Sequence, residues 1–354
     1  IEGDEGVRQI LEDQYREANR AFGKYIEDSY EDWIRNSDDN VSDDRPMLSH
    51  EVVRAAVIPE LAQDRPVIFF VIDCMRYDQW IMFERLLSPH FDSETRFHFS
   101  LLPTATPYSR NAIFSGLLPR DLAEKYPRIW AEGEEDEYSR NRDEESFLKD
   151  QLDRNRVATR LRYDKLVGTA DGREFAQRAH DLLQHDLSAV VVNFVDVLAH
   201  SRSDSAVLKE IAPDERAYRD LTRTWFEHSW LFQAMKDLAA TDCTIVITTD
   251  HGAVRSLHAA KVVGDRHTST ALRYKYGRNL KCDKRHAIFV QDPRSFGLPS
   301  TGINSNFIIA KEDYYFVYPT NYNQYLNKYR DTMQHGGASM EEVILPVVRL
   351  RPKS

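Results

Sequence analysis

The sequence is short of the residues that mark disulfide-rich and membrane-spanning proteins. Its 354 residues include only three cysteines, Cys74, Cys243 and Cys282, and no two of them have CxxC spacing. An odd number of scattered cysteines excludes a disulfide framework and is typical of reduced thiols in the cytoplasm. No apolar run approaches the ~20 residues that cross a bilayer, and the N-terminus does not resemble a secretory signal. We therefore expect a cytoplasmic protein without membrane insertion.

Net positive charge is missing as well. The net charge is −10 at pH 7, and the imbalance lies in residues 1–65, which hold 17 acidic and 8 basic side chains. The remaining residues hold 40 acidic and 39 basic side chains, which excludes a broad footprint for duplex nucleic acid. An anionic substrate must therefore be attracted locally, by bound metals or by a few basic side chains.

The first part of the chain has the pattern of helices. Residues 4–36 repeat apolar side chains at a spacing of three and four, which predicts one long amphipathic helix. The acidic stretch 36–44 is typical of a loop or linker, and a second helix is expected from Ser49 toward Pro59. We assign residues 1–62 to a helical linker or bundle segment.

The remainder, residues 63–354, alternates apolar strand-like runs with helical patterns. The uninterrupted run 67–72 is typical of a strand covered on both faces, as in a parallel sheet. This alternation predicts an α/β fold with a central, mostly parallel sheet flanked by helices. Strands are expected at 67–72, 95–102, 189–195, 244–249, 287–290, 306–310, 314–318 and 344–350. Helices are expected at 78–87, 111–114, 175–183, 214–239 and 339–343.

Two regions interrupt this alternation. Residues 119–165 are polar and charged, and we expect them to form a surface insertion. A second insertion is expected near 255–285. It includes the basic, aromatic stretch 266–279, which fits an anionic polymer, a solvated loop or a dimer contact. Strands 306–310 and 314–318 are expected to pair as a hairpin.

Polar side chains of one kind follow the predicted strands. Each is ambiguous alone, because Asp and His at strand ends also cap helices, Thr106 suits an N-cap and His335 precedes a Gly-Gly turn. Together these seven oxygen and nitrogen donors fit two zinc-like ions. Two such ions ~4 Å apart can clamp a phosphoryl displacement and activate a threonine hydroxyl. The residues are Asp73, Thr106, Asp196, His200, Asp250, His251 and His335.

These residues and their order resemble the alkaline phosphatase superfamily. The segment Pro103-Thr-Ala-Thr106 through Ile113-Phe-Ser-Gly116 is similar to the nucleophile block of nucleotide pyrophosphatase/phosphodiesterases. The resemblance implies that Thr106 is the nucleophile beside two Zn²⁺ ions. It implies one ion held by Asp196, His200 and His335, and a second held by Asp73, Asp250 and His251. Ser109 stands where those enzymes carry an oxyanion-contacting Asn, so Ser109, Arg110 and Asn111 are the candidate substrate contacts.

Three motifs more closely resemble PglZ domains. They are Ile72-Asp-Cys-Met-Arg-Tyr-Asp78, Leu102-Pro-Thr-Ala-Thr-Pro-Tyr-Ser-Arg110 and His335-Gly-Gly-Ala-Ser-Met-Glu-Glu342. The resemblance covers residues 63–354 and is strongest to the PorX-type response regulators linked to the type 9 secretion system. The N-terminal helices would then resemble the linker module that joins a receiver domain to its output domain.

The resemblance implies a two-zinc phosphodiesterase acting on nucleotides or oligonucleotides, including cyclic ones, as the output domain of a response regulator. Secretion-system or sigma-factor signalling partners, and a homodimer, are implied in the same way. Two alternatives remain: a signalling module whose partner binding is the function, and a phosphomonoesterase, sulfatase or phosphomutase on the same scaffold.

Overall fold

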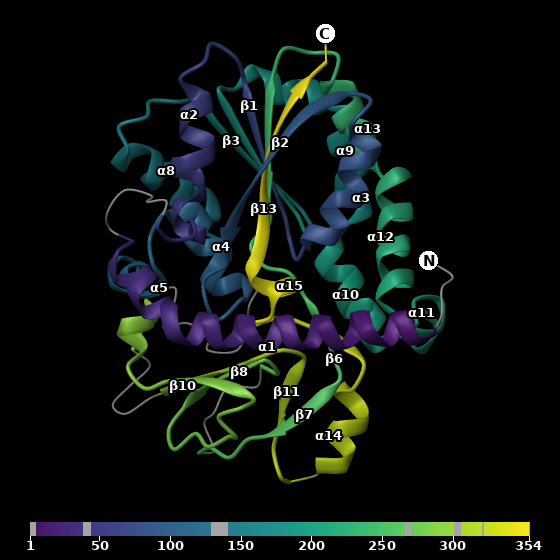
Figure 1. Cartoon of the computed structure of the whole chain (residues 1–354). Coiled ribbons are helices and arrows are strands. Elements are labelled where there is room, and N and C mark those ends of the chain that lie inside the picture. The colour runs from purple at the N-terminus through teal and green to yellow at the C-terminus, as the bar shows by residue number, and fades with distance from the viewer. Residues whose placement is uncertain are drawn as a thin grey trace.

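A six-stranded sheet forms the centre of the structure, a computed structural model (Figure 1). The description covers residues 5–37, 44–128, 141–265, 271–300, 306–320 and 322–353. The strand order is β2-β13-β5-β1-β4-β3. The bounds are β1 Val67–Ile72, β2 Phe91–Phe99, β3 Leu161–Leu166, β4 Leu187–Val192, β5 Thr244–Thr248 and β13 Ile344–Pro352.

The expected mostly parallel sheet is confirmed. β1 pairs in parallel with β4 and β5, and β3 pairs in parallel with β4. Only β13 runs in the opposite direction, because it pairs antiparallel with both β2 and β5. The carboxyl ends of β1, β4 and β5 therefore lie at one edge of the sheet, the edge where ligands bind in open α/β folds.

Helices cover both faces of the sheet, as its fully buried central strands require. Side chains of β1 alternate between two cores, since Phe70 packs with the helices on one face and Phe69 with those on the other. The first face carries α3 Tyr77–Leu87, α9 Thr169–Gln177, η3 Ala179–Gln184, α10 Phe194–Asp204, α11 Ala206–Ile211, α12 Glu215–Glu227 and α13 Trp230–Leu238. The second carries η1 Ser49–Glu51, η2 Val53–Val57, α2 Ile58–Leu61, α4 Thr106–Ser115, α5 Pro119–Lys125 and α8 Glu144–Arg154.

The prediction that residues 119–165 form only a surface insertion is wrong both for α5, whose Leu122 is buried in the core beside β1, and for the part from residue 144 onward. β3 is the edge strand of the central sheet, and Phe147 and Leu148 of α8 are buried in the core beside β1. The charged residues of this stretch lie on the outer faces of amphipathic elements, and their apolar neighbours complete the sheet. The acidic run 132–137 lies outside the described residues. The single helix predicted over 214–239 is two helices, because Ser229 caps α13 by accepting a hydrogen bond from the Phe232 amide.

A smaller unit lies at the carboxyl edge of the sheet (Figure 1). It contains β6 Val254–Ser256, β7 His258–Lys261, β8 Tyr274–Gly277, β9 Ala287–Val290, η4 Pro293–Phe296, β10 Asn306–Ala310, β11 Tyr314–Val317, α14 Tyr322–Tyr329 and β12 Thr332–Gln334. The predicted hairpin of residues 306–310 and 314–318 is wrong. β10 pairs with β8 and β9, whereas β11 pairs in parallel with β7 in another sheet.

Helix α1, Glu5–Arg35, lies between the central sheet and the smaller unit (Figure 1). Ile26, Tyr30 and Trp33 are buried in one core cluster with Leu102 and Tyr108. The predicted long helix is therefore confirmed. Its apolar side chains from Phe22 onward pack on the α/β unit, whereas Val7, Leu11 and Tyr15 are exposed. Within the residues that the structure describes, no helix is both long enough and apolar enough to cross a membrane.

Candidate metal centre

Strand ends deliver the first group of predicted ligands. Asp73 follows β1 directly, and Asp250 and His251 follow the neighbouring strand β5. Possible ligand atoms of these three residues lie within 4.8 Å of one another, and all three side chains are buried. Adjacent parallel strands end at the same edge, so side chains that are far apart in sequence are brought together.

Two carboxylate oxygens of this group point into its centre without a hydrogen bond. Asp250 Oδ1 accepts hydrogen bonds from the amides of Cys74, at 3.2 Å, and His251, at 3.0 Å, whereas its Oδ2 has no hydrogen-bond partner. Asp73 Oδ1 has none either, and both oxygens lie 3.7 Å from His251 Nε2. Buried, unsatisfied anionic oxygens are costly unless a cation binds them. The group therefore fits a divalent ion.

The imidazole of His251 is oriented as a ligand would be. Its Nδ1 lies 3.2 Å from the carbonyl oxygen of Gly252, so it donates its proton there and leaves Nε2 as an acceptor. Nε2 lies 3.0 Å from the hydroxyl oxygen of Thr106. Burial, followed by the neighbouring His335, holds the pKa of His251 well below its usual value, so the ring is neutral at pH 7.

The second group of predicted ligands comes from a helix and a turn. β4 ends at Val192, and Asp196 and His200 lie one turn apart on α10, so the prediction that a strand ends at Asp196 is wrong. Phe194 and Val195 continue the apolar run of the strand but pack as the first turn of the helix. Asp196 Oδ1 lies 3.4 Å from His200 Nε2 and 4.0 Å from His335 Nε2.

The two groups form one centre with a buried side and an open side. The imidazoles of His251 and His335 stack at a centroid distance of 4.1 Å. The three side chains of the first group are at most 4% exposed, whereas that of His200 is 52% exposed. A ligand can therefore reach the centre from the side of the second group.

Opposite pKa shifts separate the two buried aspartates. Burial raises the pKa of Asp250 well above its ordinary value, and the nearby charge of Asp73 adds to that rise. Burial is the largest single effect on Asp73 too, but the guanidinium of Arg110, together with His251 and His335, lowers the pKa of Asp73 overall. Without additional positive charge beside them, the two carboxyl groups together therefore carry less than two negative charges.

Arg110 is placed differently from a substrate contact. Its Nη1 donates to Asp73 Oδ2 at 2.5 Å, and its Nε donates to Glu144 Oε1 at 2.6 Å, in a site where the arginine is 2% exposed. Ser109 and Asn111 are fully buried and donate to backbone carbonyls of the loop and helix before them, those of Ala105 and Pro107. The structure thus gives Arg110 an electrostatic role beneath the centre.

Glu144 lies next to the centre, and no pattern in the sequence indicated it. It is fully buried, pairs with Arg110, and accepts a hydrogen bond from Tyr163. In sequence it is one of many acidic residues in a polar stretch, and its separation from Arg110 carries no periodicity. A signal could come only from knowing that α4 and α8 pack together.

Thr106 is the first residue of α4, and the N-cap position belongs to Ala105. The interpretation of Thr106 as a simple N-cap is therefore wrong. Its hydroxyl faces His251, beside the amino end of a ten-residue helix whose dipole favours negative charge.

Buried polar contacts hold the His335 turn against the Thr106 loop. Thr104 Oγ1 donates to the Gly337 carbonyl at 2.7 Å and accepts from the Gly336 amide at 3.1 Å. His335 Nδ1 lies 3.3 Å from the Thr104 carbonyl, which leaves Nε2 facing Asp196. Gly336 has φ 111°, a backbone conformation that favours glycine.

A buried ion pair supports the same turn from behind. Arg273 donates to both carboxylate oxygens of Glu342, at 3.1 and 2.5 Å, and Glu342 in turn accepts from the Gly337 amide at 2.8 Å. A β-carbon on Gly337 would lie 2.7 Å from the backbone carbonyl oxygen of Ala310 and 2.2 Å from Arg273 Nη2, so only glycine fits there without a shift of the backbone.

The family model of the BREX system PglZ alkaline phosphatase-like domain matches residues 52–350. The chain belongs to the PglZ family. Its PglZ match begins ahead of the boundary predicted at residue 63. A second family model, of the PorX response regulator linker domain, matches residues 2–34, which contain most of α1. No curated protein matches the chain.

Solved structures share the PglZ fold. Ectonucleotide pyrophosphatase/phosphodiesterase 5 of mouse matches with a TM-score of 0.52 and 10% identity, covering 80% of this chain and 88% of the other. The human protein matches with a TM-score of 0.50 and 11% identity, covering 80% and 87%. Phosphonoacetate hydrolase from Sinorhizobium meliloti 1021 matches with a TM-score of 0.50 and 11% identity, covering 80% and 89%. The fold is thus that of alkaline phosphatase-like hydrolases.

Proposed function

We propose that this PglZ domain is a two-zinc phosphodiesterase with Thr106 as its nucleophile. The observation that carries the proposal is the hydroxyl of Thr106, 3.0 Å from His251 Nε2, beside two three-residue groups whose donors fit divalent ions. Nitrogen and carboxylate donors of this kind are those that Zn²⁺ prefers. The proposed substrates are phosphodiesters of nucleotides or oligonucleotides, including cyclic ones.

Two sets of side chains would hold the ions. Asp73, Asp250 and His251 would hold one, and Asp196, His200 and His335 would hold the other. Bound there, the ions would supply positive charge that lowers the pKa of a nearby hydroxyl and balances the charge of a phosphoryl group.

The residues of the chain perform the remaining chemistry. The Thr106 hydroxyl loses its proton to solvent water and its oxygen attacks phosphorus, and the bond to the leaving oxygen breaks as that oxygen takes up a proton from solvent water. Water then hydrolyses the threonine phosphoester, which restores the hydroxyl and releases a phosphomonoester. The amino end of α4 lies beside the transferring group and favours its negative charge.

A pair of substitutions at Thr106 tests the proposal. Thr106→Ala removes the nucleophile, so we expect kcat on bis(p-nitrophenyl) phosphate to fall on the order of 10⁴-fold or more. Thr106→Ser keeps a hydroxyl and should retain measurable turnover. Elemental analysis should find two zinc equivalents in both variants, since neither loses a proposed ligand. Full activity of Thr106→Ala would overturn the assignment.

Substrate preference distinguishes a phosphodiesterase from other enzymes that share this fold. Rates on a phosphomonoester, a phosphodiester and a sulfate ester, measured side by side, should be highest for the diester. A preference for the monoester or the sulfate would favour a phosphomonoesterase, phosphomutase or sulfatase instead.

A cytoplasmic signalling context is the second part of the proposal. The match of residues 2–34 to a response regulator linker supports a role as the output domain of a two-component regulator. Secretion-system or sigma-factor partners and a homodimer belong to this context. If zinc-free protein bound its partners normally and the zinc-loaded protein hydrolysed no diester, the function would be partner binding.

A further inference from the structure

Helix α1 carries two buried polar side chains on the face that packs toward the candidate centre. Asn19 is 3% exposed and Tyr30 is 1% exposed, on a helix whose opposite face is charged and exposed. Their spacing of eleven residues is about three helical turns, so both lie on one face. Buried polar groups on a packed helix require partners of fixed geometry.

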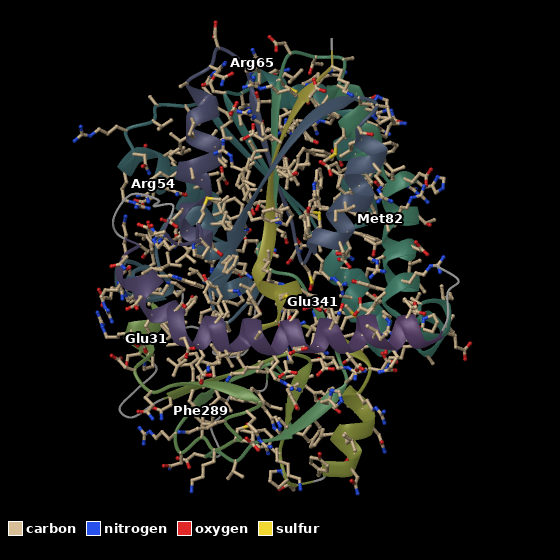
Figure 2. The ribbon with its side chains drawn as sticks, viewed as in Figure 1. Glu31, Arg54, Arg65, Met82, Phe289 and Glu341 are labelled. Atoms are coloured by element: carbon tan, nitrogen blue, oxygen red, sulfur yellow. The ribbon has the colours of Figure 1, made fainter. Side chains whose placement is uncertain are left out.

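Asn19 binds the short helix α15, Met340–Val343. Its Nδ2 donates to Glu341 Oε2 at 3.0 Å, and its Oδ1 accepts from the Met340 amide at 2.9 Å. Figure 2 shows Glu341 beside α1, where β13 begins. A bidentate contact of this kind fixes both the position and the rotation of α15 relative to α1.

α15 in turn contacts both turns that carry proposed ligands. The carbonyl of Glu342 accepts a hydrogen bond from the Gly252 amide at 3.2 Å, directly after His251. The side chain of Glu342 accepts from the Gly337 amide at 2.8 Å, two residues after His335. α15 is therefore hydrogen-bonded to both of the turns whose imidazoles stack on each other.

Tyr30 binds the loop that leads to the nucleophile. Its hydroxyl accepts a hydrogen bond from the Leu102 amide at 2.9 Å, and Leu102 is followed by the segment from Pro103 to Thr106. The Tyr30 ring packs in the same core as Leu102 and Tyr108 of α4. One helix thus contacts the loop that carries Thr106 and, through α15, both histidine turns.

We propose that α1 is a positioning element of the centre, in which Asn19 aligns the two histidine turns and Tyr30 aligns Thr106 with them. Apolar residues of α1 and its ion pair between Glu27 and Lys311 attach the helix, and the two buried polar contacts align it with α15 and with the Leu102 loop. A reacting oxygen displaced by about 1 Å can cost about 100-fold in rate. This inference rests on the proposed function for its effect on rate, but its structural part can be tested alone.

Three variants test this proposal. Asn19→Ala removes both contacts to α15, and Tyr30→Phe removes only a hydroxyl. Gln14→Ala, at an exposed position of the same helix, is the matched control for the loss of an amide. We expect the first two to lower kcat by about 10- to 100-fold with KM nearly unchanged, because alignment is lost and substrate contacts are kept. The control should match the unsubstituted chain.

Hydrogen exchange provides a readout that does not depend on turnover. Amides of residues 335–342 should exchange faster in Asn19→Ala, and those of residues 102–106 in Tyr30→Phe, with β1 and β4 unchanged. Normal kcat with normal exchange, or faster exchange throughout the chain, would overturn the proposal. If the unsubstituted chain hydrolyses no diester, the proposed function fails, and the exchange pattern still decides the role of α1.

Discussion

At the scale of single residues, the centre depends on positions where two backbones nearly touch. Gly252 follows His251, and a β-carbon built on it would lie 1.9 Å from the carbonyl oxygen of Glu341. That neighbour is backbone and cannot turn aside. Gly23 in α1 offers the contrast, because its β-carbon would meet only the flexible side chain of Lys311 at 3.4 Å.

We therefore predict opposite effects for alanine at these two glycines. Gly252→Ala should lower the free energy of unfolding by about 1–3 kcal/mol and weaken zinc binding, since it forces the His251 turn away from α15. Gly23→Ala should raise the free energy of unfolding by about 0.5–1 kcal/mol, because alanine is the better helix former. Urea unfolding and zinc titration of both variants measure this, and an undisturbed Gly252→Ala variant would contradict the described packing.

Some site residues could be predicted at this scale and others could not. Asp73, Asp250 and His251 follow buried strands directly, so sheet geometry alone brings them together. Glu144 was missed because its pairing with Arg110 depends on how α8 packs against α4, which no local pattern records. Asp196 lies in the predicted group of donors even though it sits on a helix and not at a strand end.

At the scale of elements, His98 connects strands that are not neighbours. It lies on β2, and its Nε2 lies 3.1 Å from the Thr249 carbonyl at the end of β5, with β13 between the two strands. The same nitrogen lies 3.2 Å from Thr248 Oγ1. Burial lowers the pKa of His98 to about 4, although its bond to the Thr249 carbonyl opposes that fall.

This shift predicts a loss of stability in acid. The unfolded chain binds a proton at His98 near pH 6.5, whereas the folded chain binds it only near pH 4. The contribution of neutral His98 to the free energy of unfolding is therefore fully present above pH 6.5 and is lost as the pH falls toward 4. When the pH is lowered from 7.5 to 5, the free energy of unfolding of the unsubstituted chain should fall by about 2 kcal/mol more than that of His98→Gln. Urea unfolding at both pH values measures the difference. A difference independent of pH would mean that His98 titrates normally in the fold.

Element types were easier to predict than their partners. The short apolar runs that form β1, β4 and β5 are rich in β-branched residues and favour buried strands, yet the run ending at Val195 did not reveal that a helix starts at Phe194. The end of β4 and the first turn of α10 are both apolar, and over so few residues periodicity cannot distinguish a strand from a helix. The wrong hairpin of β10 and β11 has a similar cause, since nearness in sequence favours pairing but the chain crosses into another sheet.

At the scale of the whole molecule, the proposed ions connect three elements of the central unit with the turn after β12. Removing them leaves Asp73 Oδ1 and Asp250 Oδ2 buried without a hydrogen bond. We predict that chelation lowers Tm by about 5–10 °C and that zinc restores it, as ligand binding at ~1,000 times Kd contributes about 4 kcal/mol.

Asp250→Asn and His200→Ala provide the comparison, one for each proposed ion. Each variant should show a smaller shift of Tm on chelation and contain close to one zinc equivalent by elemental analysis. If chelation shifted the Tm of Asp250→Asn as much as that of the unsubstituted chain, Asp250 would not be a ligand of the ion.

The strand order has a consequence for how the molecule is made. β13, residues 344–352, is inserted between β2 and β5, although it follows both of them in the sequence, β5 by about 100 residues. Until then β2 has no partner in the sheet, and the core face that Val348 and Leu350 cover stays open. Synthesis must therefore reach β13 before the sheet can close, and a shorter nascent polypeptide would expose apolar surface to chaperones and proteases.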